Sequence, residues 1–174
     1  MRKVKKGSVV GAGLKAKGHE VRSVTGGDND PICNKVVLLA LGTSGALEVY
    51  APIQPWLAAI GLDRGKVYIA NIVPWRPPGN RTPTPVETQI CLPFIQRQIE
   101  LADPDILVTV GQPSTGALLS VQGITKNRGR WFTYQTGTRE IRAMPILHPA
   151  YLLRSPIAKR LAWRDMLAIK KALG

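Results

Sequence analysis

The apolar residues of the chain alternate between short β-branched runs and longer stretches with helical spacing. The runs predict strands at residues 35–41, 67–73, 105–110 and 142–147, with a further loop or strand pair around 129–138. The helical stretches predict a short helix ending at Gly61 and further helices over residues 85–101, 113–119 and 155–173. This alternation predicts an α/β fold, a three-layer α/β/α sandwich with a central parallel sheet.

Polar residues follow several of these predicted strands. Asn71 begins a proline-rich stretch that reaches residue 83, Gly111 and Gln112 follow the third strand, and His148 follows the fourth. Because ligands bind at the carboxyl ends of parallel strands, we expect these segments to meet at one edge of the sheet and to form the site.

Length and composition favour one domain. The chain has 174 residues, 44% of them hydrophobic, and no apolar run of the roughly 18 to 20 residues that a membrane span requires. The basic first six residues precede neither an apolar core segment nor a small-residue cleavage site, so we expect no secretory signal. We therefore expect a soluble, cytoplasmic protein without membrane contact, and a monomer.

The charge indicates a partner rather than a fold. The net charge is +13, and residues 126–174 carry eleven Lys or Arg against Glu140 and Asp165. Such a surface suits a polyanion such as nucleic acid, which releases counterions when it binds. A basic, solvated face that serves solubility remains the alternative.

Five segments of the chain together carry a resemblance to a known family. They are Ile69-Ala-Asn-Ile-Val, Arg76-Pro-Pro-Gly-Asn-Arg-Thr-Pro-Thr-Pro85, Val110-Gly111, Arg128-Gly129 and His148-Pro-Ala-Tyr-Leu-Leu-Arg154. In this order they resemble the uracil-DNA glycosylase superfamily, most of all its bacterial and archaeal family 4. The resemblance predicts a glycosylase-like α/β domain over residues 55–174. Residues 1–54 do not match, and we interpret them as a divergent, replaced or frame-altered segment, partly disordered.

The resemblance implies roles for two residues. His148 corresponds to the histidine that donates a hydrogen bond to the uracil carbonyl oxygen, and Asn71 to the asparagine that reads the Watson–Crick edge of the flipped base. An amide offers a donor and an acceptor, which match uracil and not cytosine. Alternatively, His148 only caps the turn before the last helix and Asn71 only ends a strand.

The resemblance also implies DNA contacts. Leu152, with Tyr151 and Leu153, fits a wedge that fills the hole left by the extruded nucleotide, although all three could instead pack under the last helix. Arginines at three positions would meet phosphates, unless they are merely solvated: Arg76, Arg81 and Arg154. The expected partner is uracil-containing DNA, single- or double-stranded, in base excision repair.

Two departures from the family pattern qualify the expected activity. The family's Gly-Glu-x-Pro-Gly-like segment supplies an acid that positions water, whereas the turn at residues 42–45 has no carboxylate and the nearest acid is Glu48. A carboxylate from elsewhere could substitute. We therefore expect a uracil-DNA glycosylase that is impaired by this loss, or alternatively a non-catalytic DNA-binding module that keeps the base pocket.

The second departure concerns the cofactor. Family 4 proteins usually hold a [4Fe–4S] cluster with four cysteine thiolates. This chain has two cysteines, Cys33 and Cys91, and Trp75 stands at one ligand position. Their spacing suggests neither a disulfide scaffold nor a zinc site, so we predict reduced thiols, no metal and no iron–sulfur cluster.

Overall fold

The computed structural model describes residues 37–43, 46–63, 65–75 and 77–174 as a sheet flanked by helices. The strands are β1 (Val37–Thr43), β2 (Val67–Val73), β3 (Ile106–Val110), β4 (Phe132–Gln135) and β5 (Glu140–Ile146). The α-helices are α2 (Ala46–Ala59), α3 (Pro85–Ala102), α4 (Gln112–Leu119), α5 (Ile124–Asn127), α6 (Pro149–Arg154) and α7 (Lys159–Leu173). Two 3-10 turns are η1 (Pro78–Asn80) and η2 (Pro156–Ala158). None of the helices in these ranges is long and apolar enough to cross a bilayer.

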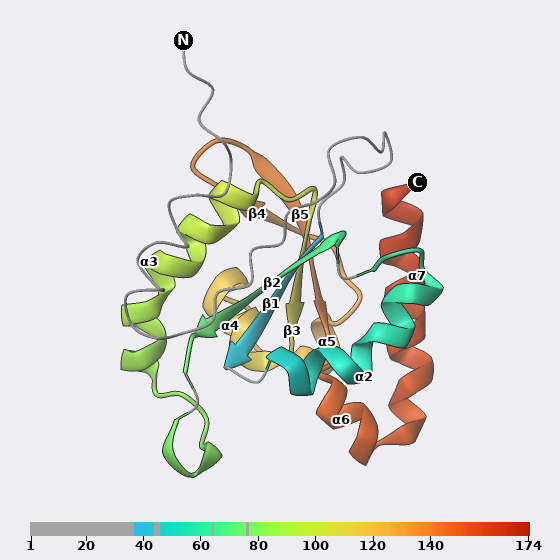
Figure 1. The fold of residues 1–174 in the computed structure, drawn as a ribbon, viewed down its shortest axis with the longest axis horizontal. Helices are drawn as coiled ribbons and strands as arrows, with labels where there is room; N and C mark the ends of the chain where they lie inside the picture. Colours follow the sequence, from blue (N-terminus) through green and yellow to red (C-terminus); the bar gives the residue numbers. More distant parts are fainter. Residues whose placement is uncertain (1–36, 44–45, 64, 76) are drawn as a thin grey trace.

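The five strands form a mixed sheet in the order β2-β1-β3-β5-β4 (Figure 1). Four strands run parallel, and β4 lies antiparallel to β5 at one edge. The alternation had led us to expect a parallel sheet. The observed sheet is mixed, because β4 is antiparallel to its neighbour. The reason is local, because β4 and β5 are joined by a short turn in which the Thr136 N–H donates to the Arg139 carbonyl at 2.9 Å, and so short a connection permits only antiparallel pairing.

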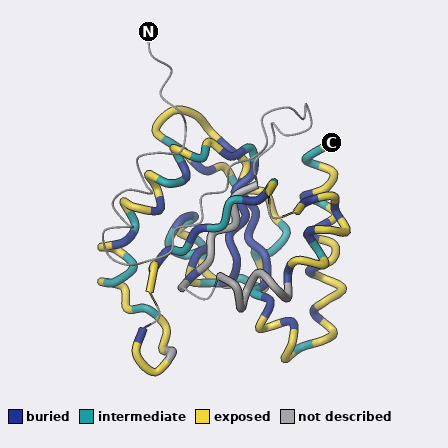
Figure 2. Tube along the Cα trace, viewed as in Figure 1, coloured by how far each residue is buried: buried dark blue, intermediate teal, exposed yellow. Residues whose placement is uncertain are grey.

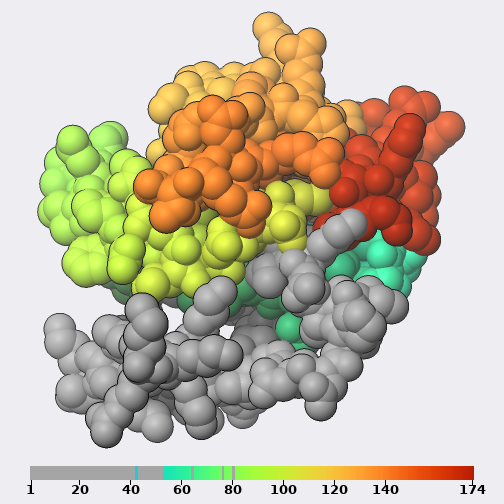
Figure 3. Space-filling model, turned by 90° about the horizontal axis from the view of Figure 1, so that it is seen from above, coloured from blue at the N-terminus to red at the C-terminus, as the bar shows by residue number. Residues whose placement is uncertain are grey.

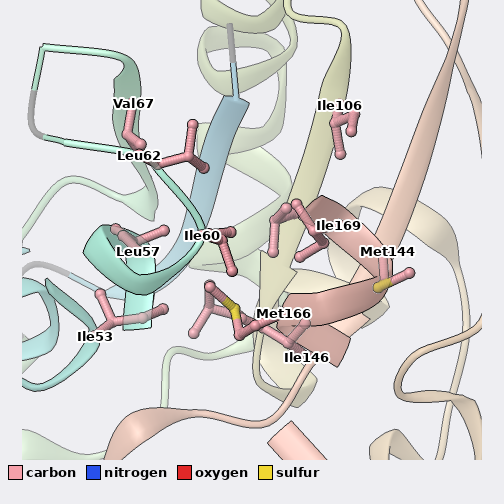
Figure 4. Packing of buried hydrophobic residues seen from close by; sticks show 12 residues of the cluster. Ile53, Leu57, Ile60, Leu62, Val67, Ile106, Met144, Ile146, Met166 and Ile169 are labelled. Carbon is pink, nitrogen blue, oxygen red and sulfur yellow. The ribbon is translucent and has the colours of Figure 1, made fainter. Parts of the chain in front are cut away.

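Helices lie on both faces of the sheet, and each face has its own apolar cluster. On one face α2 and α7 cover the strands, and Figure 4 shows this cluster at close range. Its buried members come from both helices, from the α2–β2 connection and from the three strands β2, β3 and β5: Ile53, Leu57, Ile60, Leu62, Val67, Ile106, Val108, Val110, Met144, Ile146, Met166 and Ile169. On the other face α3 and α4 pack with Ala70, Ile72, Leu107, Ile141 and Ala143. Burial of these side chains from both sides fixes the sheet as the core of the fold.

Part of the segment that we predicted to be divergent belongs to this core. Strand β1 pairs with β2 on one side and with β3 on the other, so it lies inside the sheet. Helix α2 likewise supplies Ile53 and Leu57 to the core on either side of the expected boundary at residue 55. Residues 1–36 of the predicted N-terminal segment, together with 44 and 45, lie outside the described residues.

Two arginines tie α7 to the rest of the fold. Arg142 on β5 donates to the Ala172 carbonyl at 3.0 Å, and its guanidinium lies 5.1 Å from the centre of the Trp131 ring. Arg128 donates from Nε to Asp165 Oδ2 at 2.8 Å and from NH2 to the Leu161 carbonyl at 2.7 Å. Since one contact lies near each end of α7, its position relative to the sheet is fixed along its length.

Candidate active site at the carboxyl edge of the sheet

The parallel strands bring the predicted site segments to one edge. The register aligns Asn71 on β2 with Leu41, Leu41 with Val110 on β3, and Val110 with Ile146 on β5. His148 follows Ile146 by two residues. Asn71 and Ile146 are thus three strand spacings apart, roughly 14 Å at about 4.8 Å per spacing. The carboxyl ends of the parallel strands thus carry both predicted residues.

His148 is the N-cap of α6, and this role determines which ring nitrogen carries the proton. The Ala150 N–H donates to His148 Nδ1 at 3.2 Å, so Nδ1 is an acceptor and the neutral ring carries its hydrogen on Nε2. Burial, and to a lesser degree the charge of Arg154, lower the pKa of His148 below its usual 6.5. The imidazole is therefore neutral at pH 7 and presents an Nε2–H donor.

The turn between β3 and α4 packs closely against His148. Gly111 has φ of 84°, and a Cβ placed there would lie 3.2 Å from the His148 Cβ. The Gly111 N–H donates to the Ile146 carbonyl at 2.9 Å, while the buried hydroxyls of Ser114 and Thr115 donate to the Gly111 carbonyl at 3.1 and 2.9 Å. A glycine is required here both by the backbone angle and by the close approach of the histidine.

Asn71 carries a buried acceptor that no described residue satisfies. Its side chain is half-buried in β2, and its Oδ1 is shielded from solvent without a hydrogen-bond donor among the described residues. A buried acceptor without a partner costs about 1 to 3 kcal/mol, and such atoms are rare in folded proteins. Because β-strand side chains alternate, Asn71 shares the face of Val67 and Ile69, which is the face that α2 and α7 cover. The orphaned oxygen is suited to accept a hydrogen bond from a ligand.

The proline loop is held by a network at the start of α3. Arg81 NH1 and NH2 each donate to a Glu87 carboxylate oxygen at 2.8 Å. The Thr84 N–H donates to Glu87 at 2.7 Å, and the Glu87 N–H donates back to Thr84 Oγ1 at 3.2 Å, which completes a capping box. Arg81, which we expected to meet a phosphate, is thus engaged by its own chain. Arg76, the other loop arginine, lies outside the described residues.

Replacement of Glu87 by Gln is expected to lower the melting temperature near pH 7 and to have no effect near pH 2. Arg81 and the Thr84 N–H lower the pKa of Glu87 to about 2. A lowered acid pKa stabilises the fold above the unfolded pKa near 4.5, and this contribution is lost as pH falls toward 2. Thermal unfolding of both proteins between pH 2 and 7 measures the difference. The Glu100→Gln variant, which breaks the exposed pair with Arg97 on the same helix, is the control; an equal pH profile for both variants would contradict the assignment.

Helix α6 separates the predicted DNA-contacting residues into exposed and buried ones. Leu152 is only 8% exposed and packs with Leu147, Ala158 and Ala162, whereas Leu153 is 65% exposed. Tyr151 and Arg154 are also exposed. Leu152 is therefore a packing residue under the last helix, which was the alternative to its role as a wedge. Helical spacing from Pro149 would have indicated this, because Leu152 shares the buried side of Pro149 three residues earlier.

The carboxylates with described side chains are all engaged by other groups. Each has a hydrogen bond or an ion pair to another residue: Asp63, Glu87, Glu100, Asp103, Asp105, Glu140 and Asp165. Nothing is described for the side chain of Glu48 on α2. Among the described side chains, the site thus has a histidine and an amide, and no uncommitted acid.

Metal-ligating side chains are sparse in the described ranges. Cys91 is buried on α3, where burial and, secondarily, Glu87 raise the pKa of its thiol. Trp75, which stands at one of the cluster-ligand positions expected from the resemblance, is exposed. Cys33 lies outside the described residues. No group of three or more His, Cys, Asp or Glu in the described part could hold a metal ion.

Comparison with known proteins relates this geometry to a family. The model of the Uracil DNA glycosylase superfamily matches residues 50–167. The type-4 uracil-DNA glycosylase of Sulfurisphaera tokodaii is 37% identical over 117 residues, which cover 64% of this chain and 53% of that protein. The protein of the same name from Thermotoga maritima is 43% identical over 99 residues, covering 55% and 49%. This chain spans about half the length of these relatives.

A third relative has a different architecture. The DNA polymerase of Bacillus phage SP01 is 36% identical over 101 residues, which cover 58% of this chain and 10% of the polymerase. The matched region therefore also occurs as a small part of a much longer protein.

The relatives overturn the prediction that no cofactor is involved. They are type-4 enzymes, the class to which the resemblance assigned an iron–sulfur cluster, so a cysteine count in this chain could not exclude one. The described residues do not themselves fit a cluster, because only Cys91 among them is a cysteine and four thiolates are required.

Proposed function

This chain belongs to the uracil-DNA glycosylase superfamily, and from that premise we propose that it hydrolyses the N-glycosidic bond of uracil flipped out of DNA. In this reaction the bond between uracil N1 and the sugar C1′ breaks, and its electron pair leaves with the base. Water adds to C1′ and loses a proton. The protein must therefore stabilise negative charge on the departing uracil.

The observation that carries the proposal is the fixed tautomer of His148. Because Nδ1 accepts from the Ala150 N–H, the Nε2–H is the ring's free donor. A neutral donor fixed by a helix cap can hydrogen-bond a carbonyl oxygen of uracil as charge develops there, without a proton transfer. The capping role and the catalytic role, which we had set against each other, are thus compatible in one residue.

Asn71 would select the base in this scheme. Its unsatisfied Oδ1 can accept the hydrogen bond that uracil N3–H donates. Cytosine has no hydrogen at N3, so it would leave this oxygen without a partner. A site that must satisfy a buried polar atom in this way can discriminate strongly against the wrong base. Register, burial and the two opposed apolar clusters also support the proposed three-layer α/β/α arrangement as the frame of this pocket.

The wedge is better assigned to Leu153 than to Leu152. Replacement of Leu153 by Ala is expected to slow uracil release from duplex DNA by about tenfold, because an exposed apolar side chain no longer fills the vacated stack. Release from single-stranded DNA should change little, since no intact stack has to be opened there. Rates measured on matched single- and double-stranded substrates test this difference.

The neighbouring residue provides the matched control. Leu152→Ala is expected to lower the free energy of unfolding by about 2 to 5 kcal/mol, as is usual for a buried leucine. It should then reduce activity on both substrates alike at temperatures near its melting point. A duplex-specific loss in Leu152→Ala rather than in Leu153→Ala would return the wedge to Leu152.

One experiment separates this proposal from the alternative of a non-catalytic DNA-binding module. That alternative is favoured by the engagement of every carboxylate whose side chain is described. The protein is incubated with uracil-containing single- and double-stranded DNA and then with alkali, which breaks the strand at abasic sites. Strand breaks support the glycosylase, at a low rate if an acid is lacking. Salt-sensitive binding without breaks supports the module.

A further inference from the structure

The outward side of α7 carries charge of one sign. Its cations are exposed along the whole helix: Lys159, Arg160, Arg164, Lys170 and Lys171. The single acid of the helix, Asp165, is 2% exposed and is paired with Arg128 on the inner side. Exposed apolar side chains stand between the cations, namely Leu161, Trp163 and Leu167. The accessible face of α7 therefore combines cations with an aromatic ring and no acid.

This helix begins at the edge that carries the candidate site. α6 ends at Arg154, and α7 starts at Lys159 after the turn η2. From there α7 extends about 22 Å, at 1.5 Å per residue, toward the opposite edge of the sheet. Figure 1 shows it next to α2 at the side of the molecule, and Figure 2 shows its outer side exposed. In the view from above, α7 forms part of the rim (Figure 3). The cationic face of α7 thus begins close to the carboxyl ends of the strands, where the candidate site lies.

The cations of α7 differ from most others in the described residues. Several arginines elsewhere are engaged by carboxylates, among them Arg81, Arg97 and Arg139. No ion pair within the described ranges involves any of the five exposed cations of α7. Like charges four residues apart, as at Arg160 and Arg164, destabilise an isolated helix. An anionic partner would offset this repulsion.

Trp163 indicates which anionic partner fits. Its ring meets Trp56 edge-on, with 6.1 Å between centroids and an angle of 69°, while 39% of the residue remains exposed. Trp56 thus restrains an aromatic ring that solvent can still reach. Single-stranded nucleic acid uses this combination, because bases stack on aromatic rings and phosphates contact nearby cations. A duplex hides its base faces and would use the cations alone.

We propose that the outward face of α7 is a second nucleic-acid-binding surface, which binds a single strand through base stacking on Trp163 and phosphate contacts from Arg160, Arg164, Lys170 and Lys171. The surface holds a strand outside the base pocket, whether or not that strand contains uracil. It extends the proposed function without depending on cleavage.

The test measures affinity for a uracil-free single-stranded oligonucleotide by fluorescence anisotropy at several salt concentrations. The Arg164→Gln/Lys171→Gln variant is expected to reduce the slope of log affinity against log salt by about 1.4, since each lost phosphate contact contributes about 0.7. The Lys66→Gln/Arg97→Gln variant loses the same charge on other surfaces and should leave the slope unchanged. Trp163→Leu is expected to weaken binding at least about fivefold.

The outcomes divide clearly. Equal loss of slope in both double variants would overturn the proposal in favour of a general charge effect. The proposal is also overturned if the α7 variants lose binding to phosphatidylserine vesicles and keep binding to the oligonucleotide. In that case α7 would be a membrane-contacting helix. Thermal unfolding shows whether Trp163→Leu is folded, and the charge variants decide the question if it is not. Because the oligonucleotide lacks uracil, absence of glycosylase activity would leave this result unaffected.

Discussion

Replacement of His148 by Ala is expected to lower the rate of uracil release by about 10²- to 10³-fold, the usual effect of removing one donor to a developing negative charge. The reason lies in the cap of α6, which leaves the Nε2–H of a neutral ring free to donate to the departing base. Single-turnover rates on a uracil-containing oligonucleotide measure the chemical step. The His19→Ala variant, which removes the chain's other histidine, should keep the wild-type rate.

The pH dependence gives a second check on the same residue. Burial and the nearby Arg154 lower the pKa of His148, so the ring stays neutral as pH falls through 6.5. The wild-type rate is therefore expected to stay level from pH 8 to below 6.5, as far as His148 determines it. The sign for stability follows from linkage: the unfolded chain takes up a proton below pH 6.5 before the folded one does, so the free energy of unfolding decreases over that range. A rate that falls with a midpoint above 6.5 would contradict the assignment.

The strands and the long helices could be predicted because local signals and burial agree in them. The start of α3 is an example, since Thr84, Pro85 and Glu87 form a capping signal that the structure realises as a capping box. Strand β2 was predicted with its observed bounds, because a β-branched run buried on both sides leaves little ambiguity. At these places propensity, pattern and packing favour the same structure.

Prediction failed where a proline could be interpreted in two ways. We interpreted Pro149 as part of a turn, and it is the first residue of α6, a position where its missing N–H costs nothing. Because α6 was not predicted, its spacing could not be used to separate Leu152 from Leu153. The antiparallel β4 was uncertain for a related reason: a short strand pair joined by a turn gives a weak local pattern, and only its pairing with β5 defines it.

Two features of the site depend on contacts that no sequence pattern reveals. The close approach of Gly111 to His148 joins residues that follow different strands. The orphaned oxygen of Asn71 is defined by the absence of a donor around it in the described structure, which requires coordinates. Position and resemblance identified His148 and Asn71 from the sequence. Neither could supply the geometry that gives these two residues a chemical role.

The ion pair between Arg128 and Asp165 is another contact that no sequence pattern reveals, and we expect it to contribute strongly to the free energy of unfolding. The resemblance drew attention to Arg128-Gly129, and the partner of this arginine lies 37 residues further along the chain. The Asp165 carboxylate is almost fully buried; burial raises its pKa and the charge of Arg128 opposes that shift. Gly129, with φ of 71°, lies against the same carboxylate, so that a Cβ there would collide with Asp165 Oδ1. The Gly129 N–H donates to the Pro145 carbonyl at 2.9 Å, three residues before His148.

Asp165→Ala is therefore expected to lower the free energy of unfolding by about 3 to 5 kcal/mol, because it leaves the largely buried guanidinium of Arg128 without its counter-charge. Glu100→Ala, which removes the half-buried partner of the exposed Arg97, should cost less than about 1 kcal/mol. Urea unfolding of both variants measures the difference. The Arg128→Met/Asp165→Ala double variant is expected to be more stable than the sum of the two single effects predicts, since no unpaired charge remains. Simple additivity would show that the pair contributes through packing alone, and α7 would then be held to the sheet by its apolar residues.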